Sequence, residues 1–178
     1  AGLVAAERGS PGVRYQDAAR VPERTNLAVD RGKGFEEMRD VIGSQPAKTP
    51  DEGEARVHAT AGAVAIGARF PLIAFNVNLD SDDLDLAKRI AVDIREKDGG
   101  MKCVKAIGLR LDEGAVQVSM NLTDYRVTSM ADVVEAIRQH ADVAGVAIRE
   151  SEVVGLLPQD ALVRLAQSAL HATGFTRD

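Results

Sequence analysis

Two stretches of the chain alternate apolar side chains with side chains that carry hydrogen-bond donors and acceptors. They are LIAFNVNL at residues 72–79 and VQVSMNL at residues 116–122. Period-two alternation is typical of a strand with one buried face, so the polar side chains are expected to share the other face. This polar set, called the amide stripe below, is Asn76, Asn78, Gln117, Ser119 and Asn121. Donor-and-acceptor groups suit an amide, pterin or amidine edge of a ligand; the alternative is an ordinary solvated sheet face.

A second candidate site is the polar loop from Gly53 to Gly62, where glycines let backbone amides approach a ligand. His58 lies in this loop, flanked by Arg56 and Thr60. It could contact an anion or a pterin, or act as a general acid or base; the alternative is a surface loop histidine. Beyond the loop, Arg69 could hold a carboxylate bidentately, or could clamp a neighbouring backbone.

No residue is assigned a catalytic role, and no metal site is expected. His140 lies late in a predicted helix and His171 lies in the C-terminal tail, so the histidines show neither metal-ligand spacing nor a carboxylate or nucleophile partner at a workable spacing. The acidic run Asp80, Asp82, Asp83 and Asp85 could resemble a cation site, but acids in the first turn of a helix explain it more simply.

Composition excludes several classes of partner. The 178 residues carry a formal charge of −5, 3% aromatic residues and no Trp, which argues against nucleic acid as a partner. There is no long apolar run, so neither a signal peptide nor a membrane span is expected. The one cysteine, Cys103, sits in an apolar run and suggests a buried thiol in a reducing cytoplasm.

After Pro71 the pattern predicts a strand, a helix, two strands joined at a Gly-containing turn, a helix, a fourth strand and a last helix. The order β-α-β-β-α-β predicts an α+β, ferredoxin-like antiparallel sheet with both helices on one face and the amide stripe on the other. Asp80 or Ser81 is expected to cap the first helix, and Thr128 or Ser129 the second. The last helix is expected to turn these side chains inward: Ala161, Leu162, Leu165, Ala166 and Ala169.

The first 50 residues are rich in charge, Gly and Pro. They begin with what resembles the end of a helix stopping at Gly9, which indicates a fragment, a processed chain or a truncated gene product. A short extended piece is expected at residues 13–15 and a helix at residues 35–41. Too few large apolar residues are present to bury a core, so this segment must lean on other structure or form a flexible linker.

Several motifs together resemble the glutamate formimidoyltransferase family. They are Y-Q-D-A-A-R-V-P-E-R-T-N-L-A from residue 15, D-E-G-E from 51, H-A-T-A-G-A from 58, I-G-A-R-F-P-L-I-A-F-N-V-N-L from 66, V-Q-V-S-M-N-L-T-D-Y from 116 and E-S-E-V-V-G-L-L-P from 150. The resemblance covers nearly the whole chain. It implies that residues 1–50 are the tail of an N-terminal subdomain, residues 51–70 a folate-facing loop and linker, and residues 71–178 a C-terminal subdomain.

The resemblance also implies transfer of a formimino group from N-formimino-L-glutamate to tetrahydrofolate in histidine degradation. Tetrahydrofolate would be a co-substrate, with no metal. Gly53, Arg56, His58, Thr60 and Gly62 would contact folate, whereas Arg69 and the amide stripe would position the substrate. The alternative function is a non-catalytic module that binds folate or an amino acid.

The sequence departs from the family pattern at several points, and each departure leads to an expectation. The family's H-K-G-E-H-P-R-type segment, which holds the catalytic histidine, does not occur in this sequence. The chain alone is therefore expected to be inactive and to need the missing N-terminal subdomain. The family's D-F-G-P reads Asp51-Glu52-Gly53-Glu54 here, and the two added charges would repel a folate glutamate tail. Apolar side chains left uncovered at Leu3, Val4, Tyr15 and Leu27 predict a homo-oligomer.

Overall fold

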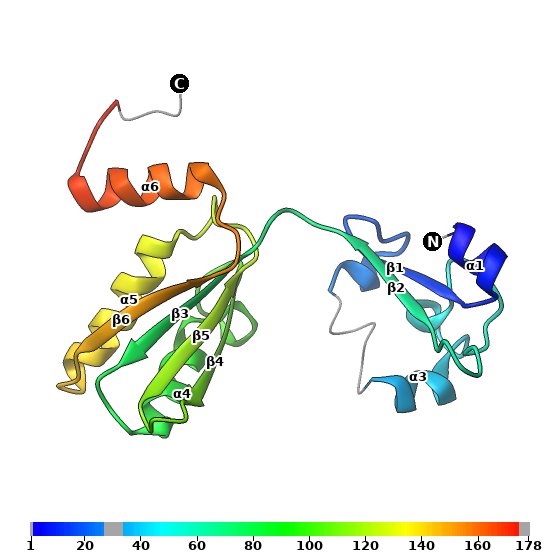
Figure 1. The fold of residues 1–178 in the computed structure, drawn as a ribbon, viewed down its shortest axis with the longest axis horizontal. Helices are drawn as coiled ribbons and strands as arrows, with labels where there is room; N and C mark the ends of the chain where they lie inside the picture. The colour runs from blue at the N-terminus through cyan, green and yellow to red at the C-terminus, as the bar shows by residue number, and fades with distance from the viewer. Residues whose placement is uncertain (1, 27–33, 175–178) are drawn as a thin grey trace. The chain divides into compact units, whose positions relative to one another are not determined.

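The computed structural model describes residues 2–26 and 34–174, which form two compact units dividing after Arg69. Each unit is described by itself. The first contains α1 (Gly2–Arg8), β1 (Gly12–Gln16), η1 (Pro22–Thr25), α3 (Phe35–Val41), η2 (Pro46–Lys48) and β2 (Val64–Ala68) (Figure 1). The second contains β3 (Ile73–Leu79), α4 (Leu84–Ile94), η3 (Glu96–Asp98), β4 (Val104–Arg110), β5 (Val116–Leu122), α5 (Met130–Val143), β6 (Ile148–Val154) and α6 (Gln159–Leu170). Among the described residues, no helix is both long enough and apolar enough to cross a membrane.

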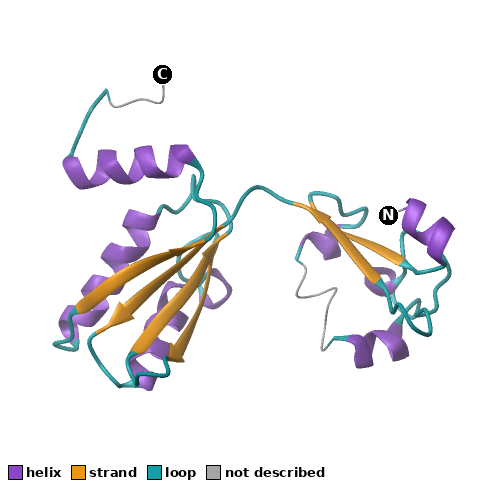
Figure 2. Cartoon of the chain, in the orientation of Figure 1, coloured by secondary structure: helices purple, strands orange, loops and turns teal. Residues whose placement is uncertain are grey.

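The second unit is built on a four-stranded sheet in the order β4-β5-β3-β6. Every neighbouring pair is antiparallel, and the first and third strands of the unit, β3 and β5, are central. Helices α4 and α5 lie on the same side of this sheet (Figures 1 and 2). The predicted α+β, ferredoxin-like fold is therefore confirmed.

The core of this unit lies between the sheet and the two helices. On the central strands the inward side chains are Ile73, Phe75, Val77, Leu79, Val116, Val118, Met120 and Leu122, all at most 5% exposed. From the helices, buried side chains repeat at helical spacing, as at Leu86, Ile90 and Ile94 of α4 and Val133 and Ile137 of α5. Burial of these apolar surfaces is the main force that holds the sheet to its helices.

The ends of the two helices are fixed by side-chain caps. Asp83, rather than the predicted Asp80 or Ser81, caps α4: its carboxylate accepts from Asp85 N at 2.9 Å and Leu86 N at 3.0 Å. Ser81 Oγ instead accepts a hydrogen bond from Asp83 N at 3.0 Å. The N-cap of α4 is therefore two residues after Ser81. Ser129 caps α5 in a reciprocal arrangement with Asp132, as predicted.

Helix α4 packs closely on β4 because Gly108 leaves room for it. A Cβ at Gly108 would lie 2.7 Å from the Ala87 carbonyl oxygen and would also collide with Lys88 N. Both atoms belong to the helix backbone, so no side-chain rotation could relieve the overlap. The absence of a side chain at Gly108 therefore sets the distance between helix and sheet.

Further predictions about the second unit are wrong. Leu162 and Ala169 of α6 are expected to face inward, but Leu162 is 51% exposed and Ala169 is exposed as well. The reason is that α6 packs on α5 rather than on the sheet, with Ala161 and Leu165 as its more buried residues. Cys103 was expected to be a buried thiol but is only partly buried. It occupies a turn before β4 with φ of 61°, outside the strand that would have buried it.

The first unit has a two-stranded parallel sheet, in which β1 pairs with β2. Strand β2 lies in a stretch expected to be loop and linker; its sequence, VAIGA, holds a Gly and two Ala and carries little strand signal. Tyr15 was expected to be left uncovered, but it pairs with Gly67 and its ring occupies the space a Cβ there would need. Leu3 is 76% exposed as expected, whereas the Val4 side chain and Leu27 lie outside the described part of the chain.

Candidate functional site

The helix-free face of the sheet carries three cross-strand rows of four side chains, because residues paired in antiparallel strands share a face. The first row is Leu109, Gln117, Asn78 and Glu150; the second is Ile107, Ser119, Asn76 and Glu152; the third is Lys105, Asn121, Ala74 and Val154. All five residues of the amide stripe therefore meet on one face. We call the twelve positions the open face.

Hydrogen bonds link the polar members of the first two rows. Gln117 Nε2 donates to Asn78 Oδ1 at 2.8 Å, and Asn78 Nδ2 donates to Glu150 Oε1 at 3.1 Å. In the second row Asn76 Nδ2 donates to Glu152 Oε2 at 3.0 Å. A carboxylate only accepts hydrogen bonds when ionised, so these contacts fix which way each asparagine amide points.

Burial differs along the open face. Asn78 and Gln117 are 8% and 5% exposed, whereas Asn76 and Ser119 are half-buried and Asn121 is exposed. The description of an ordinary solvated face thus fits Asn121 but not the Asn78–Gln117 pair. A buried, hydrogen-bonded amide pair gives rigid donor and acceptor positions.

Glu150 and Glu152 are residues of this face that the sequence analysis did not single out. The region was predicted to be a strand, and the glutamates alternate in I-R-E-S-E-V-V. That spacing signals a shared face, but only the pairing of β6 with β3 shows that it is the face of the amide stripe.

The loop from Gly53 to Gly62 is a compact turn in the first unit. His58 and Gly62 form an antiparallel bridge with two backbone hydrogen bonds of 3.0 Å. His58 Nδ1 accepts from Thr60 N at 3.2 Å and Ala61 N at 3.0 Å. Since Nδ1 is the acceptor, the neutral ring carries its proton on Nε2. His58 therefore holds the turn together, and its Nε2–H is the atom left for a ligand.

The other loop residues predicted to contact folate are more accessible. Gly53 and Gly62 have φ of 84° and 71°, a region that glycine adopts readily. Arg56 and Thr60 are exposed, and the Arg56 side chain reaches Glu54 at 3.3 Å. His58, Thr60 and Gly62 thus belong to one turn, and Gly53 and Arg56 precede it in the same loop.

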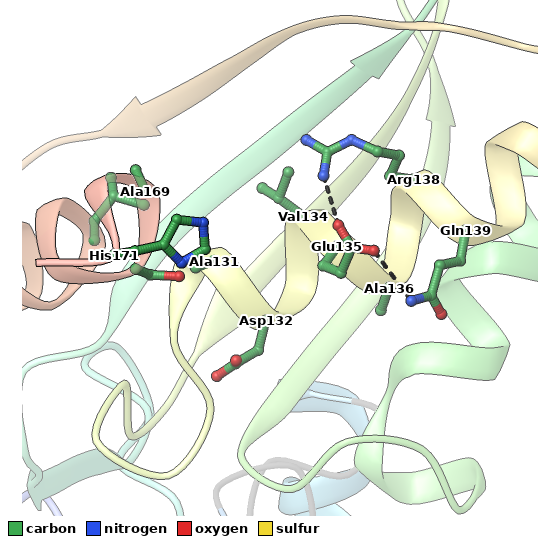
Figure 3. A pocket seen from close by; sticks show the side chains of 11 residues that line it. Ala131, Asp132, Val134, Glu135, Ala136, Arg138, Gln139, Ala169 and His171 are labelled. Carbon is green, nitrogen blue, oxygen red and sulfur yellow. Dashed lines mark hydrogen bonds and ion pairs between the residues drawn. The ribbon is translucent and has the colours of Figure 1, made fainter.

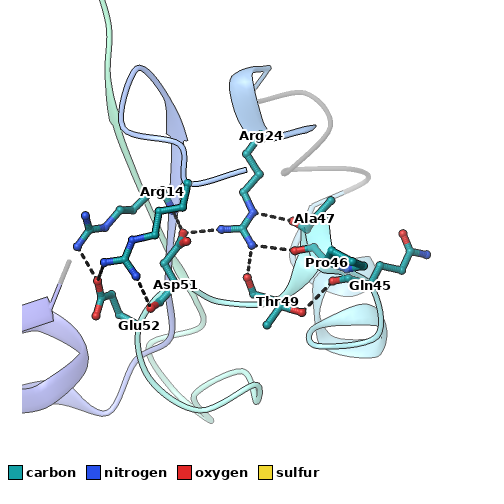
Figure 4. Close-up of polar contacts among 9 residues, drawn as sticks. Arg14, Arg24, Gln45, Pro46, Ala47, Thr49, Asp51 and Glu52 are labelled. Carbon is teal, nitrogen blue, oxygen red and sulfur yellow. Dashed lines mark hydrogen bonds and ion pairs between the residues drawn. The ribbon is translucent and has the colours of Figure 1, made fainter. Parts of the chain in front are cut away.

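A buried ion pair anchors the start of this loop (Figure 4). Arg24 and Asp51 have side chains only 3% and 5% exposed and approach within 2.5 Å. Arg24 also donates to the carbonyl oxygens of Ala47, Pro46 and Thr49. A guanidinium satisfied by four acceptors ties η1, η2 and the loop together, which supplies a polar core where apolar residues are few.

Glu52 does not add an unpaired charge to the loop. Its Oε1 lies 2.5 Å from Arg14 Nη2 and 3.0 Å from Arg20 Nη2, so two guanidinium groups neutralise it. The expected repulsion of a folate tail therefore does not follow for Glu52. The partners lie 32 and 38 residues away in sequence, which is why the sequence did not reveal them.

Arg69 is exposed and ends the first unit, whereas the open face belongs to the second. The predicted site residues are thus divided between the two units. The Gly53–Gly62 turn and Arg69 lie in the first, and the amide stripe lies in the second.

A cleft of about 650 Å³ lies between α5 and α6 (Figure 3). Its lining includes Asp132, Glu135, Arg138, Ser168 and His171. Glu135 is engaged by Arg138 at 2.6 Å and by Gln139 at 3.1 Å. None of the residues predicted to bind folate or to position substrate lines this cleft.

One histidine has a carboxylate neighbour, contrary to expectation. His140 Nδ1 of α5 lies 3.7 Å from Asp93 Oδ2 of α4. Packing of two helices distant in sequence creates this contact, which no local spacing could show. Both side chains are substantially exposed, and both helices lie on the face of the sheet opposite the amide stripe.

In the second unit, the side chains of Phe70, Tyr125 and Arg126 form a cluster. The Phe70 and Tyr125 ring centroids are 5.7 Å apart, and the Arg126 guanidinium lies 3.8 Å from the Phe70 centroid. Arg126 also donates twice to Asp124, at 2.8 and 2.7 Å. This bidentate contact lowers the pKa of the Asp124 carboxyl and raises the pKa of the Arg126 guanidinium.

The acidic run contributes to structure. Asp83 caps α4 and Asp80 pairs with Arg149 at 3.5 Å. Across residues 2–26 and 34–174, no group of three or more His, Cys, Asp and Glu side chains is placed to hold a metal ion.

Comparison with known proteins agrees with the motifs. Residues 74–174 match the formiminotransferase domain, and residues 1–69 match the formiminotransferase domain, N-terminal subdomain. The chain is 43% identical over 170 residues to a glutamate formimidoyltransferase of Streptococcus pyogenes serotype M1, covering 95% of this chain and 56% of the relative. It is 43% identical over 175 residues to that of Thermoplasma acidophilum, covering 97% and 57%.

A longer relative is the formimidoyltransferase-cyclodeaminase of Rattus norvegicus, which is 36% identical over 170 residues. The match covers 92% of this chain and 31% of that protein. The chain thus spans little more than half the length of the two glutamate formimidoyltransferases and about a third of the cyclodeaminase.

Proposed function

This chain belongs to the formiminotransferase family, and on that premise we propose that it takes part in formimino transfer from N-formimino-L-glutamate to tetrahydrofolate, a step of histidine degradation in the cytoplasm. Two relatives are named glutamate formimidoyltransferase and formimidoyltransferase-cyclodeaminase, and these names support transfer of a formimino group. The observation that carries the proposal beyond the family is the buried amide pair of the open face, because rigid neutral amides recognise a polar planar group.

In this reaction a nitrogen of tetrahydrofolate attacks the formimino carbon and forms a new carbon–nitrogen bond. The tetrahedral centre then breaks its bond to the glutamate nitrogen. The proton lost by the folate nitrogen must finally reside on the departing amine, so the reaction needs a group that moves protons.

We assign binding and orientation to the described residues. The amide stripe and Arg69 would position the substrate, and the turn from Gly53 to Gly62 would contact folate, with His58 offering only its Nε2–H. Proton transfer is assigned to a histidine segment of the H-K-G-E-H-P-R type, supplied by an N-terminal subdomain. Within the described residues, His58 caps a turn and His140 and His171 lie away from the open face, which supports this assignment.

Ligand titration and a turnover assay on the purified 178-residue chain test the proposal. We expect saturable binding of folate or N-formimino-L-glutamate in calorimetry and no formimino transfer above the buffer rate. Arg56→Ala should weaken folate binding. Arg138→Ala is the matched control, since Arg138 is also an exposed arginine paired with a nearby glutamate but lies on α5.

The outcomes separate the parts of the proposal. If the chain binds neither ligand, the assigned function is wrong. If it turns over, the assignment of proton transfer to a separate segment is wrong. If Arg138→Ala weakens folate binding as much as Arg56→Ala does, the turn is not the folate contact.

A further inference from the structure

The open face grades from apolar to anionic across the sheet. In its first two rows the β4 positions are Leu109 and Ile107, the central positions are amides or a hydroxyl, and the β6 positions are Glu150 and Glu152. Neither row contains a Lys or an Arg. Lys105 lies in the third row at the far edge, and Arg149, next to Glu150 in sequence, pairs with Asp80 at 3.5 Å. The β6 side of these rows therefore carries negative charge without a basic partner within them.

The direction of the hydrogen bonds leaves acceptors for a ligand. Glu150 accepts a hydrogen bond from Asn78 Nδ2. Asn78 therefore presents its Oδ1 to Gln117, which donates a hydrogen bond to it from Nε2. Gln117 is 5% exposed, and its Oε1 accepts no hydrogen bond within the described part of the chain. This oxygen is not among the polar side-chain atoms that are sealed from solvent without a partner, so it is accessible as an acceptor for a ligand.

We propose that these two rows bind the positively charged amidinium group of an N-formimidoyl amino acid, with Glu150 and Glu152 as its specificity-determining residues. This inference rests on the proposed function, because it names the part of the substrate that meets the open face. A formimino group attached to nitrogen is an amidine, which is protonated at neutral pH. It is planar, and its nitrogens donate hydrogen bonds without accepting any, as in guanidinium.

The chemistry of the rows matches such a group and disfavours the rest of the substrate. Carboxylates and amide oxygens accept from amidinium N–H groups, and charge-assisted hydrogen bonds of this type are the stronger ones. The two carboxylates of a glutamate moiety would be repelled by Glu150 and Glu152. They must therefore be held by basic groups elsewhere, which leaves the formimino carbon over the amide stripe.

Formamidinium chloride is a minimal probe for this recognition. Titrated into the 178-residue chain, it should shift the side-chain amide NMR signals of Asn76, Asn78 and Gln117 in a saturable way, while sodium glutamate should not. The double variant Glu150→Gln/Glu152→Gln should bind formamidinium about tenfold more weakly, as expected for the loss of two partly exposed charge contacts. Gln retains an acceptor for Asn76 and Asn78, so the variant keeps these hydrogen bonds.

Glu113→Gln is the matched control for each single variant, because it removes one glutamate charge from the exposed β4–β5 turn. It should change formamidinium affinity less than twofold. Thermal melts of each variant show whether the fold is kept. Formamidinium titration of the single variants Glu150→Gln and Glu152→Gln tests each carboxylate separately. The inference is overturned if formamidinium leaves the three amide signals in place, if the folded double variant binds it as tightly as the parent, or if glutamate shifts the same signals equally well.

The probe also separates this inference from the function on which it rests. If N-formimino-L-glutamate binds the double variant as tightly as the parent, the open face is not the amidinium site, although the proposed function stands. If formamidinium binding depends on Glu150 and Glu152 while neither natural ligand binds, amidinium recognition stands and formimino transfer does not.

Discussion

At the scale of single residues, neighbouring positions of one strand have opposite roles. Val77 is fully buried against the helices, whereas Asn76 and Asn78 face the other way and reach Glu152 and Glu150. Asn78 has a second task, because its oxygen accepts from the buried Gln117. Removing Asn78 would leave that donor without a partner, so binding and folding would change together. Because Asn76 is half-buried, a substitution there distinguishes an effect on binding from an effect on folding more clearly.

Asn76→Ala should weaken binding of N-formimino-L-glutamate by roughly one hydrogen bond, about 1 kcal/mol, with little loss of stability. Val118→Ala, a fully buried position of β5, should instead lower the free energy of unfolding by about 1–3 kcal/mol through lost burial and a cavity. Calorimetric titration alongside thermal melts checks both. If Asn76→Ala lowers the melting temperature as much as Val118→Ala while binding per folded molecule is unchanged, the stripe is structural.

The Asp124–Arg126 contact predicts a pH-dependent stability. Because the folded-state pKa of Asp124 lies below its ordinary value, the contact stabilises the fold at neutral pH and is lost as acid protonates the carboxyl. Asp124→Asn should therefore melt below the parent at pH 7, and the difference should shrink below about pH 4. Asn keeps the oxygen that accepts from Arg126 N at 3.0 Å, so the variant isolates the charge. Equal differences in melting temperature at pH 7 and in acid would contradict this account.

At the scale of elements, contacts between backbones set how closely the layers pack. The α4 backbone approaches β4 where Gly108 has no side chain, whereas in the first unit the Tyr15 ring fills the space above Gly67. The two glycines differ in what a Cβ would meet. At Gly67 a rotatable side chain could swing away, but at Gly108 the helix itself would have to move.

Gly108→Ala should thus lower the free energy of unfolding by about 1–3 kcal/mol or more, as overpacking of a core does. Ile107→Ala is the control on the same strand, since Ile107 is 54% exposed on the open face and should cost less than about 1 kcal/mol. Urea unfolding of both variants measures the difference. A Gly108→Ala protein as stable as the parent would show that α4 has freedom to shift.

At the scale of the whole molecule, the two units are held together by different forces. The second has a contiguous apolar core between sheet and helices. In the described part of the first, Val13 and Pro11 are buried alongside the Arg24–Asp51 pair and its carbonyl acceptors. A charged cluster gives less net stability than apolar burial, because both ions lose their hydration. The first unit is therefore expected to open more easily.

Exposed apolar side chains predict that the chain associates with itself. Besides Leu3, four of them fall within residues 153–162: Val153, Val154, Leu156 and Leu162, which are 41–94% exposed. Covering such surface removes it from water, so we expect dimers or larger species at micromolar concentration in sedimentation velocity. Leu156→Ser, at the most exposed of the four, should shift the distribution toward monomer, whereas Lys97→Ser, on the exposed η3 turn, should not. A parent protein that sediments as a monomer would contradict the prediction.

The sequence by itself determined the features that depend on local periodicity. Alternation in residues 72–79 and 116–122 assigned each side chain to a face, helical spacing gave the inward stripes of α4 and α5, and separated motifs indicated the family. These periodic patterns can be recognised in a sequence because side chains return to the same face every two residues in a strand and every 3.6 residues in a helix. The order of the elements then left few topologies, of which the ferredoxin-like sheet is one.

Only the tertiary structure decided which distant residues meet. Glu150 and Glu152 join the amide stripe through the pairing of β6 with β3, Glu52 is neutralised by arginines of the first 20 residues, and Asp93 lies beside His140. The strand β2 forms from a weak local pattern because β1 offers a ladder for it. Such contacts depend on strand register and helix packing between segments far apart in sequence, and no local spacing encodes them.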